Sequence, residues 1–340
     1  MKKLENPEQL ENRKADHIEL ALKSQVQMAQ IDNRFYYEPL LSGHVNELPN
    51  TKFLGKNLST PIWVSSMTGG TEMAHFINHN LAKACLKFGM GMGLGSCRPL
   101  LESNERFEDF NLRPLMGNDL PLFANLGVAQ IEEILASGRI EKIANLVSDL
   151  EADGLIVHVN PLQEWLQPEG DRFTKAPIIT ISELINKLDL QVIVKEVGQG
   201  MGRASLKSLL QMPLAAIDFG AHGGTNFAKL EMRRNTDLQR KHYQETANIG
   251  HSANEMVNMV NELVGELGNQ VMCKEIIVSG GVKNFLDGYY HTSKLKLNSV
   301  YGQASALLKP AREGFEPLVE YLNLQIEGLK MAHSFLRVKV

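Results

Sequence analysis

The chain has 340 residues, of which 43% are hydrophobic and 22% are charged, and its formal net charge is −4 at pH 7. This globular composition excludes a low-complexity chain, and the weak negative charge excludes a global attraction to nucleic acid or to an anionic membrane. The three scattered cysteines form neither a disulfide framework nor a CxxC metal pair, and no apolar run approaches the roughly 20 residues of a membrane helix.

The N-terminal segment, MKKLENPEQLENRK, is too polar for a secretory signal, so we expect a cytoplasmic protein with no nucleic-acid partner and no membrane insertion. Residues 1–60 precede the first predicted strand. Within them, ENRKADHIELAL (11–22) is typical of a helix. We expect residues 1–60 to form an extension that packs on a single domain made by residues 61–340.

Eight short apolar runs follow, and each ends in glycine or in polar residues. Helix-like segments lie between them, such as AHFINHNLAKACLKF (74–88) and ASLKSLLQ (204–211). Alternating strands and helices predict parallel strands, and continuous apolar runs are typical of a sheet that is buried on both faces. Eight repeats predict an α/β fold of the (β/α)8 TIM-barrel type, with a doubly wound open sheet as the alternative. The runs cover residues 61–70, 88–96, 121–127, 154–160, 191–198, 215–224, 275–282 and 298–305.

A long polar insertion, residues 225–252, follows the sixth predicted strand. Long loops inside a compact domain are usually lids or disordered segments. We expect this one to cover the substrate or to join subunits. The last predicted helix is GFEPLVEYLNLQIEGLKMAHSFL (314–336).

Polar or glycine-rich elements stand at nearly every predicted strand end, where a (β/α)8 barrel builds its active site. Glycines after the seventh and eighth strands let backbone N–H groups approach a phosphate, although plain turns also use glycine. Their convergence predicts a site with a phosphate subsite. These strand ends are Ser65–Gly70, Ser96 with Arg98, Asn125, His158 with Asn160, Lys195, Gly223–Thr225, Gly280 with Gly281, and Gly302–Ser305.

His158 and Asn160 are two residues apart, so they share one face of the fourth strand. Gln163 and Glu164 follow in the loop over the mouth. Glu164 is either a ligand for Mg²⁺, which prefers carboxylate and phosphate oxygens, or a rim carboxylate that faces water.

Lys195 either neutralises a phosphate, forms a Schiff base, stabilises an anionic cofactor ring or is a solvated strand-end lysine. Cys97 is either a nucleophile or a small packing residue, and its neighbour Arg98 is suited to bind phosphate oxygens. The glycine-rich GMGMGLG (89–95) does not fit GxGxxG, and GxxxxGK[ST] is absent. A bound nucleotide would therefore use the phosphate site of the barrel itself.

Nine segments carry a family resemblance: RKADHI (13–18), MTGG (67–70), GLGSCRP (93–99), ANLG (124–127), HVNPLQE (158–164), VKEVGQGM (194–201), DFGAHGGTNF (218–227), SGG (279–281) and YGQASA (301–306). Together they resemble type-2 isopentenyl-diphosphate isomerase. The resemblance covers most of the chain in the family's order. HVNPLQE and GGTNF, with RK near the N-terminus, are its specific elements.

The resemblance implies an FMN-dependent (β/α)8 barrel of isoprenoid biosynthesis that interconverts isopentenyl diphosphate and dimethylallyl diphosphate without net redox change. It also implies a flavin reduced by NADPH or NADH, a requirement for Mg²⁺, and a homo-oligomer, a tetramer or an octamer.

The resemblance also assigns roles to individual residues. It implies FMN contacts by Met67, Thr68, Gly69, Ser96, Asn125, Lys195, Gly220, Thr225, Gly280, Gly281, Ala304 and Ser305. It implies substrate contacts by Arg13, Lys14, Ser96, Arg98, His158, Asn160 and Gln163, with Gln163 and His158 as catalytic residues and Glu164 on Mg²⁺. Many family members carry serine where Gly220 stands, so we expect only a backbone contact there.

Three other readings stay open. A 2-hydroxy-acid oxidase should carry a His–Gly–Arg–Gln motif near the sixth or seventh strand, whereas AHGGTNF (221–227) continues with Thr and Asn. An inosine-monophosphate-dehydrogenase-like enzyme would need Cys97 as its nucleophile. A non-catalytic flavin or phosphosugar binding protein would not need the polar residues of 158–164 together at one strand end.

Overall fold

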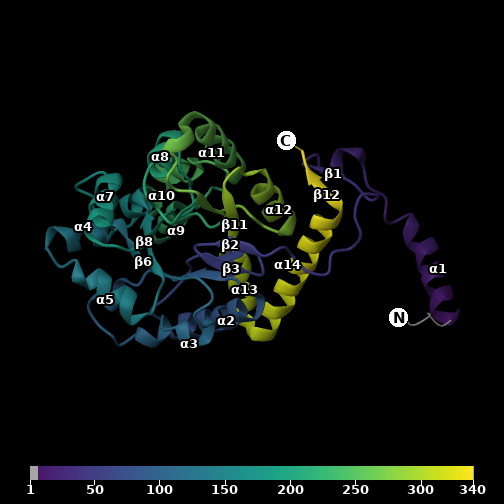
Figure 1. The fold of residues 1–340 in the computed structure, drawn as a ribbon, viewed down its shortest axis with the longest axis horizontal. Helices are drawn as coiled ribbons and strands as arrows, with labels where there is room; N and C mark the ends of the chain where they lie inside the picture. The colour runs from purple at the N-terminus through teal and green to yellow at the C-terminus, as the bar shows by residue number, and fades with distance from the viewer. Residues whose placement is uncertain (1–6, 340) are drawn as a thin grey trace.

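Eight parallel strands close into a barrel at the centre of the molecule (Figure 1). The structure is a computed structural model that describes residues 7–339. Around the barrel, the strand order follows the chain, and the last strand pairs with the first. The predicted (β/α)8 barrel is therefore confirmed. Its strands are β4 (Ile62–Val64), β5 (Gly91–Gly93), β6 (Leu122–Gly127), β7 (Gly154–Val159), β8 (Gln191–Glu196), β9 (Ala216–Asp218), β10 (Glu275–Ser279) and β11 (Asn298–Gln303).

Helices cover the outside of the barrel, and the segments whose patterns predict helices are helical. The longest is α14 (Phe315–Phe335), which crosses the barrel wall beside α13 and α12 (Figure 1). The other helices of the barrel are α2 (Glu72–Phe88), α3 (Arg113–Met116), α4 (Val128–Ala136), α5 (Glu141–Asp149), α6 (Pro161–Leu166), α7 (Pro177–Lys187), α8 (Arg203–Leu210), α11 (Ala253–Leu267), α12 (Phe285–Lys294) and α13 (Ser305–Glu313).

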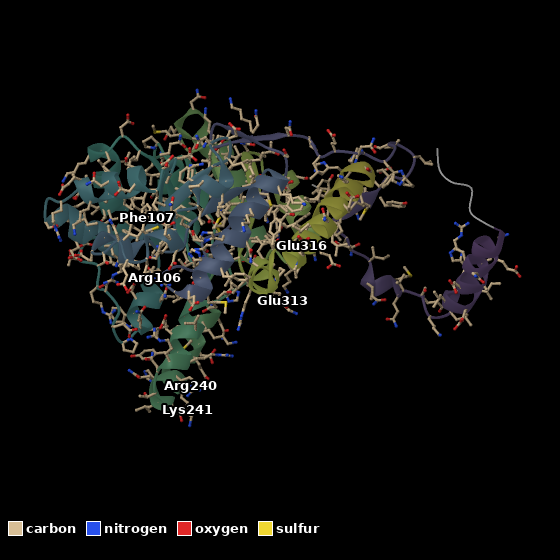
Figure 2. The ribbon with its side chains drawn as sticks, turned by 90° about the horizontal axis from the view of Figure 1, so that it is seen from below. Arg106, Phe107, Arg240, Lys241, Glu313 and Glu316 are labelled. Atoms are coloured by element: carbon tan, nitrogen blue, oxygen red, sulfur yellow. The ribbon has the colours of Figure 1, made fainter. Side chains whose placement is uncertain are left out.

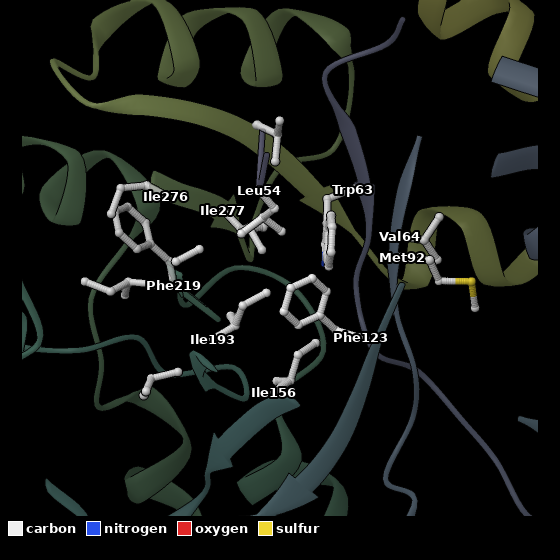
Figure 3. Close-up of a cluster of buried hydrophobic side chains, with 14 of the residues drawn as sticks. Leu54, Trp63, Val64, Met92, Phe123, Ile156, Ile193, Phe219, Ile276 and Ile277 are labelled. Carbon is white, nitrogen blue, oxygen red and sulfur yellow. The ribbon is translucent and has the colours of Figure 1, made fainter. Parts of the chain in front are cut away.

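Large side chains fill the barrel interior (Figure 3). Trp63 and Phe123 are fully buried, and their ring centroids lie 6.1 Å apart in an edge-to-face arrangement. The glycines of β5 make room for Trp63 and for Ile156. A Cβ atom at Gly91 would lie 2.4 Å from the Trp63 side chain, and one at Gly93 would lie 2.4 Å from Cδ1 of Ile156. The glycine-rich GMGMGLG is thus a packing feature of the strand, not a nucleotide-binding loop.

A short hairpin closes the barrel at the amino ends of its strands. It consists of β2 (Thr51–Phe53) and β3 (Lys56–Leu58). Phe53 is fully buried with its ring centroid 6.2 Å from that of Trp63. Lys56 forms an ion pair with Asp153, the residue before β7. The opposite end of the barrel, at the carboxyl ends of the strands, is left to form a mouth.

A small sheet joins a segment of the N-terminal part to the C-terminal end of the described chain. β1 (Phe35–Tyr37) pairs antiparallel with β12 (Leu336–Val338). Before it, α1 (Pro7–Ala21) lies apart from the barrel in both Figures 1 and 2. Every residue from 11 to 33 is exposed. The predicted domain boundary at residue 60 stays a prediction.

The insertion after β9 is folded into helices. α9 (Phe227–Arg234), α10 (Asp237–Tyr243) and the 3₁₀ turn η4 (Gln244–Asn248) make up most of it. α9 packs against α6, and the end of α10 that carries Arg240 and Lys241 projects from the body (Figure 2). Within residues 7–339, no helix combines the length and the apolar character that crossing a membrane requires.

Candidate active site

A cavity of about 520 Å³ lies at the mouth of the barrel, where the carboxyl ends of the strands converge. Most of the site residues expected from sequence line it. They are Met67, Ser96, Arg98, Asn125, His158, Asn160, Gln163, Glu164, Lys195, Gly220, Thr225, Gly280, Gly281, Ala304 and Ser305.

Four expected residues do not line this cavity. The carbonyl of Thr68 accepts a hydrogen bond from Asn78 at 3.1 Å and lies against Gly95, and Gly69 packs against Phe110. These two belong to the loop behind the cavity wall. Arg13 and Lys14 lie on the separate helix α1, so the structure does not bring them together with the other site residues (Figure 1).

Glycines from two neighbouring strand ends form one side of the cavity. Gly223, Gly280 and Gly281 have φ angles of 121°, 85° and 74°, which favour glycine. A Cβ atom at Gly223 would lie 3.0 Å from Cα of Gly281. Any larger residue would therefore fill the space between the two loops.

The N-terminus of α13 lies on the same side. Ala304 and Ser305 line the cavity there, and no side chain caps the helix. Free backbone N–H groups at a helix N-terminus favour an anion. Together with the glycine loops, this end of α13 forms a backbone cradle suited to a phosphate group.

His158 faces the cavity from β7 in a defined tautomer. Asn125 donates its amide to the carbonyl of Leu94 at 2.9 Å, so its Oδ1 is left to accept from Nδ1–H of His158, also at 2.9 Å. The other ring nitrogen, Nε2, then carries a lone pair. Burial, with a smaller effect of the charge on Lys195, lowers the pKa of His158 to about 4.

The residues after β7 form a hydrogen-bonded group. Asn160 donates its amide to Gln163 at 3.1 Å and to Glu164 at 2.9 Å. Gln163 in turn donates to Glu231 of α9 at 3.2 Å, and Arg234 pairs with the second oxygen of Glu231 at 2.7 Å. The insertion thus supplies a buried carboxylate to the end of β7.

Glu164 is the carboxylate expected to bind Mg²⁺. Its second oxygen accepts the backbone N–H of Asp171 at 2.7 Å. Among the described residues, no group of three or more His, Cys, Asp or Glu side chains could hold a metal ion. A cation at Glu164 would therefore depend on oxygens from a bound ligand and from water, which suits Mg²⁺ beside a phosphate.

Arg98 lies at the rim of the mouth with an acidic partner. Its Nη1 atom lies 3.0 Å from Oδ2 of Asp171, which also accepts from Gln130 at 2.8 Å. Cys97 next to it is fully buried and donates to the carbonyl of Gly95. Burial raises the pKa of the Cys97 thiol to about 12, so Cys97 is a packing residue and not an activated nucleophile.

Sequence reasoning missed several polar residues at this site. Asp218 ends β9 inside an apolar run, and that position was the signal that could have identified it. Glu231 lies in the polar insertion, where one carboxylate cannot be told from its neighbours. Gln130 and Asp171 come from segments beyond the strand ends.

Comparison with known proteins places the chain in a family. No family model matches it. An isopentenyl-diphosphate delta-isomerase of Rickettsia felis is 35% identical over 326 residues, covering 94% of this chain and 90% of the relative. The chain belongs to the isopentenyl-diphosphate delta-isomerase family. A second member of that family, from Rickettsia typhi, is 33% identical over 328 residues, with 94% and 91% covered.

Two solved structures share the fold at low sequence identity. A mandelate oxidase variant with a monooxide FMN adduct aligns with a TM-score of 0.59 at 13% identity, covering 90% of this chain and 88% of that one. The flavin-binding domain of baker's yeast flavocytochrome b2 aligns with a TM-score of 0.58 at 16% identity, covering 88% and 72%. At this identity the likeness shows the shared barrel fold alone.

Proposed function

We propose that this protein interconverts isopentenyl diphosphate and dimethylallyl diphosphate, with FMN bound in the mouth of the barrel. The names of its relatives support this activity. One structural observation gives this proposal its main support. The polar group Asn160–Gln163–Glu164 and the anion cradle of β10 and β11 line the same cavity, together with Lys195.

The cavity fits FMN. The backbone cradle at Gly280, Gly281 and α13 suits the phosphate, and Lys195 is a cation beside the space for the ring. The hydroxyl oxygens of Ser65 and Ser66 are buried and have no hydrogen-bond partner among the described residues, although both residues line the cavity. Buried polar atoms of this kind are usually satisfied by a ligand or by water.

We assign the FMN contacts to the residues expected from sequence. Met67 would lie near the ring, and Lys195 at its N1–C2 edge. Contacts by Thr68 and Gly69, which do not line the cavity, would require their loop to move toward it. The Gly220 contact would come from the backbone, because this residue has a φ of 52° and a Cβ atom there would lie 1.9 Å from the Glu196 carbonyl. The remaining assigned contacts are Ser96, Asn125, Thr225, Gly280, Gly281, Ala304 and Ser305.

The substrate diphosphate would bind on the β7 side of the cavity. Ser96 and Arg98 offer donors there. We assign Asn160 to the same contact, which requires its amide to turn from Gln163 or Glu164 toward the substrate. His158 offers a lone pair at Nε2 and becomes a donor if a bound anion draws a proton onto it. Glu164 would hold Mg²⁺ against the diphosphate oxygens and so offset their charge.

We assign Gln163 to handling or orienting the proton at the alkene, with His158 as the second catalytic residue. The Glu231 carboxylate, which is held by Arg234, accepts a hydrogen bond from the Gln163 amide. This bond sets the orientation of the Gln163 side chain. Reduced FMN, when bound, would supply an electron-rich ring and a proton at N5. Exclusion of water by the bound substrate would keep the proton transfer within the site.

We further propose NADPH or NADH as the source of reducing equivalents and a homo-oligomer, a tetramer or an octamer, as the assembly. The exposed helix α1, with Arg13 and Lys14, is the part of the chain that this assembly would employ. For these two residues to bind substrate, α1 would have to reach the cavity of its own chain or that of a second copy.

The decisive experiment combines flavin binding with an isotope assay. Purified protein is loaded with FMN and incubated with isopentenyl diphosphate, NADPH and Mg²⁺ in D2O. We expect dimethylallyl diphosphate to form and deuterium to enter both compounds. Protein that binds no FMN, or that leaves isopentenyl diphosphate unlabelled, would contradict the proposal. Mandelate and lactate in the same assay, with oxidation as the readout, test the 2-hydroxy-acid oxidase alternative.

A further inference from the structure

Three buried polar side chains lie together where the ends of β8, β9 and β10 meet. Lys195 and Asp218 are direct neighbours in the register of β8 and β9, and Ser279 ends β10. Their exposed fractions are 8%, 0% and 3%. Residues this polar are rarely buried without a specific partner.

The contacts among these residues form a chain. Nζ of Lys195 lies 3.4 Å from Oδ2 of Asp218 and donates to the Glu196 carbonyl at 2.9 Å. Ser279 donates its hydroxyl to Oδ1 of Asp218, and the backbone N–H of Gly220 donates to that hydroxyl oxygen at 2.9 Å. Oδ2 of Asp218 has no hydrogen-bond partner among the described residues, so its contact with Lys195 is an ion pair only.

Asp218 and Lys195 differ in their access to a ligand. Lys195 lines the cavity, whereas Asp218 has no exposed surface. Asp218 therefore cannot touch a bound molecule and acts only through Lys195. Because an ammonium group loses hydration when it is buried, a carboxylate at this distance favours its charged form.

Other titratable groups near Lys195 do not supply this negative charge. His158 of β7 is held neutral by its low pKa of about 4. The Glu196 carboxylate interacts with the charge on Lys195 but forms no ion pair with it, and it accepts three backbone N–H groups, those of Gly198, Gln199 and Gly200. Burial also raises the pKa of Glu196. Asp218 is thus the carboxylate in direct contact with the ammonium group.

We propose that Asp218 is the positioning residue that keeps Lys195 charged and directed into the cavity, and that Ser279 fixes the Asp218 carboxylate for this purpose. The consequence for flavin rests on the proposed function. There, a charged Lys195 directed into the cavity would favour an anionic ring over a neutral one.

The first test measures the charge of Lys195 directly, without flavin. Lys195 is labelled with acetic anhydride at a series of pH values and quantified by mass spectrometry, since only the neutral amine reacts. In Asp218→Asn, we expect the midpoint of labelling at Lys195 to fall by about 2 pH units, which corresponds to about 100-fold faster labelling at a fixed pH below both midpoints. Ser279→Ala should move the midpoint in the same direction by less.

A matched control separates this effect from general loss of stability. Asp153→Asn also removes an ion-paired carboxylate, but at the opposite end of the barrel, beside Lys56 and Arg113. We expect it to leave the labelling of Lys195 unchanged. Equal labelling midpoints in the wild type, Asp218→Asn and Ser279→Ala would overturn the proposal. If Asp218→Asn does not fold, Ser279→Ala decides alone.

The second test uses the FMN-loaded protein. The ionisation of N1 in the reduced flavin is followed by its absorbance spectrum under anaerobic titration. We expect Asp218→Asn to shift this ionisation relative to the wild type and Asp153→Asn to leave it unchanged. An unshifted ionisation would overturn the flavin part of the proposal. If the wild type binds no FMN, the proposed function fails, whereas the labelling experiment still decides the role of Asp218.

Discussion

At the scale of single residues, His158 shows how a neighbour determines chemistry. Asn125 fixes its tautomer and burial keeps it neutral, since its pKa is lowered to about 4. In the unfolded chain this imidazole has its ordinary pKa of about 6.5. Between these values the unfolded chain binds more protons than the folded protein. The stability from His158 is therefore full above about pH 6.5 and is lost as the pH falls through 4.

We predict that His158→Gln weakens this acid sensitivity. The full shift corresponds to about 3 kcal/mol, and water in the cavity reduces that figure. Urea unfolding at pH 7.5 and at pH 4.5 measures the loss for each protein. The variant should lose less stability than the wild type between the two pH values, and His242→Gln, at an exposed site, should lose as much as the wild type. Equal losses for all three would show that His158 does not titrate as described.

At the scale of elements, the loop after β8 holds the inserted helices in place. Glu196 organises the loop, and the Gln199 side chain donates to the carbonyls of Thr246 at 3.1 Å and Ile249 at 2.7 Å. The backbone N–H of His251 donates to the Gln199 carbonyl at 2.7 Å. These bonds anchor the C-terminal end of the insertion, and α9 of the same insertion places Glu231 against Gln163.

We predict that Gln199→Leu loosens the insertion. Leucine cannot donate to the two carbonyls, so the segment should open more often, and trypsin should cleave after Arg240 or Lys241 about 10-fold faster, equivalent to about 1.4 kcal/mol in local opening. Turnover should also fall, because opening of the insertion breaks the hydrogen bond between Gln163 and Glu231. Gln211→Leu, which removes an exposed amide pair with Gln270, is the control. Unchanged cleavage in Gln199→Leu would refute the anchoring role.

The same elements show which parts of the site could be predicted from sequence. The strand ends could be predicted, because parallel strands in chain order bring their carboxyl ends together and glycines mark the close approaches. Glu231 could not, since its position depends on how α9 packs on α6. Asp218 could have been predicted, because it stands at the end of an apolar run, two residues before Gly220 in DFGAHGG. Arg13 and Lys14 remain predictions from resemblance, because the fold gives α1 no contact with this cavity.

At the scale of the whole molecule, the N-terminal arm, residues 7–33, exposes apolar side chains to water, which is unfavourable for a monomer. Ile18, Leu22, Val26 and Met28 are each between 79% and 87% exposed. An isolated helix of this length is marginal in water, and exposed apolar residues that lie close together often mark contacts between proteins. The arm is therefore the segment that we expect to contact a second copy of the chain.

We predict that deleting residues 1–33 lowers the oligomeric state. Light scattering coupled to size exclusion should give a multiple of the 37.9 kDa chain for the full protein and a smaller multiple for the truncated one. Ile18→Asp with Leu22→Asp should act in the same direction while retaining the arm. The exposed pair Leu324→Asp with Met272→Asp lies elsewhere and serves as the control. A monomeric full-length protein would contradict the prediction that the arm contacts a second copy.

The pairing of β4 with β11 has a consequence for synthesis on the ribosome. β4 needs β11 as one of its two neighbours, and the two strands are about 240 residues apart in the chain. At about 5 to 20 residues per second, the open edge of β4 waits roughly 10 to 50 s for its partner. The sheet of β1 and β12 closes later still, when the last residues emerge. A nascent chain of this protein thus presents an unfinished strand edge through most of its translation, which makes it a substrate for chaperones that shield such edges.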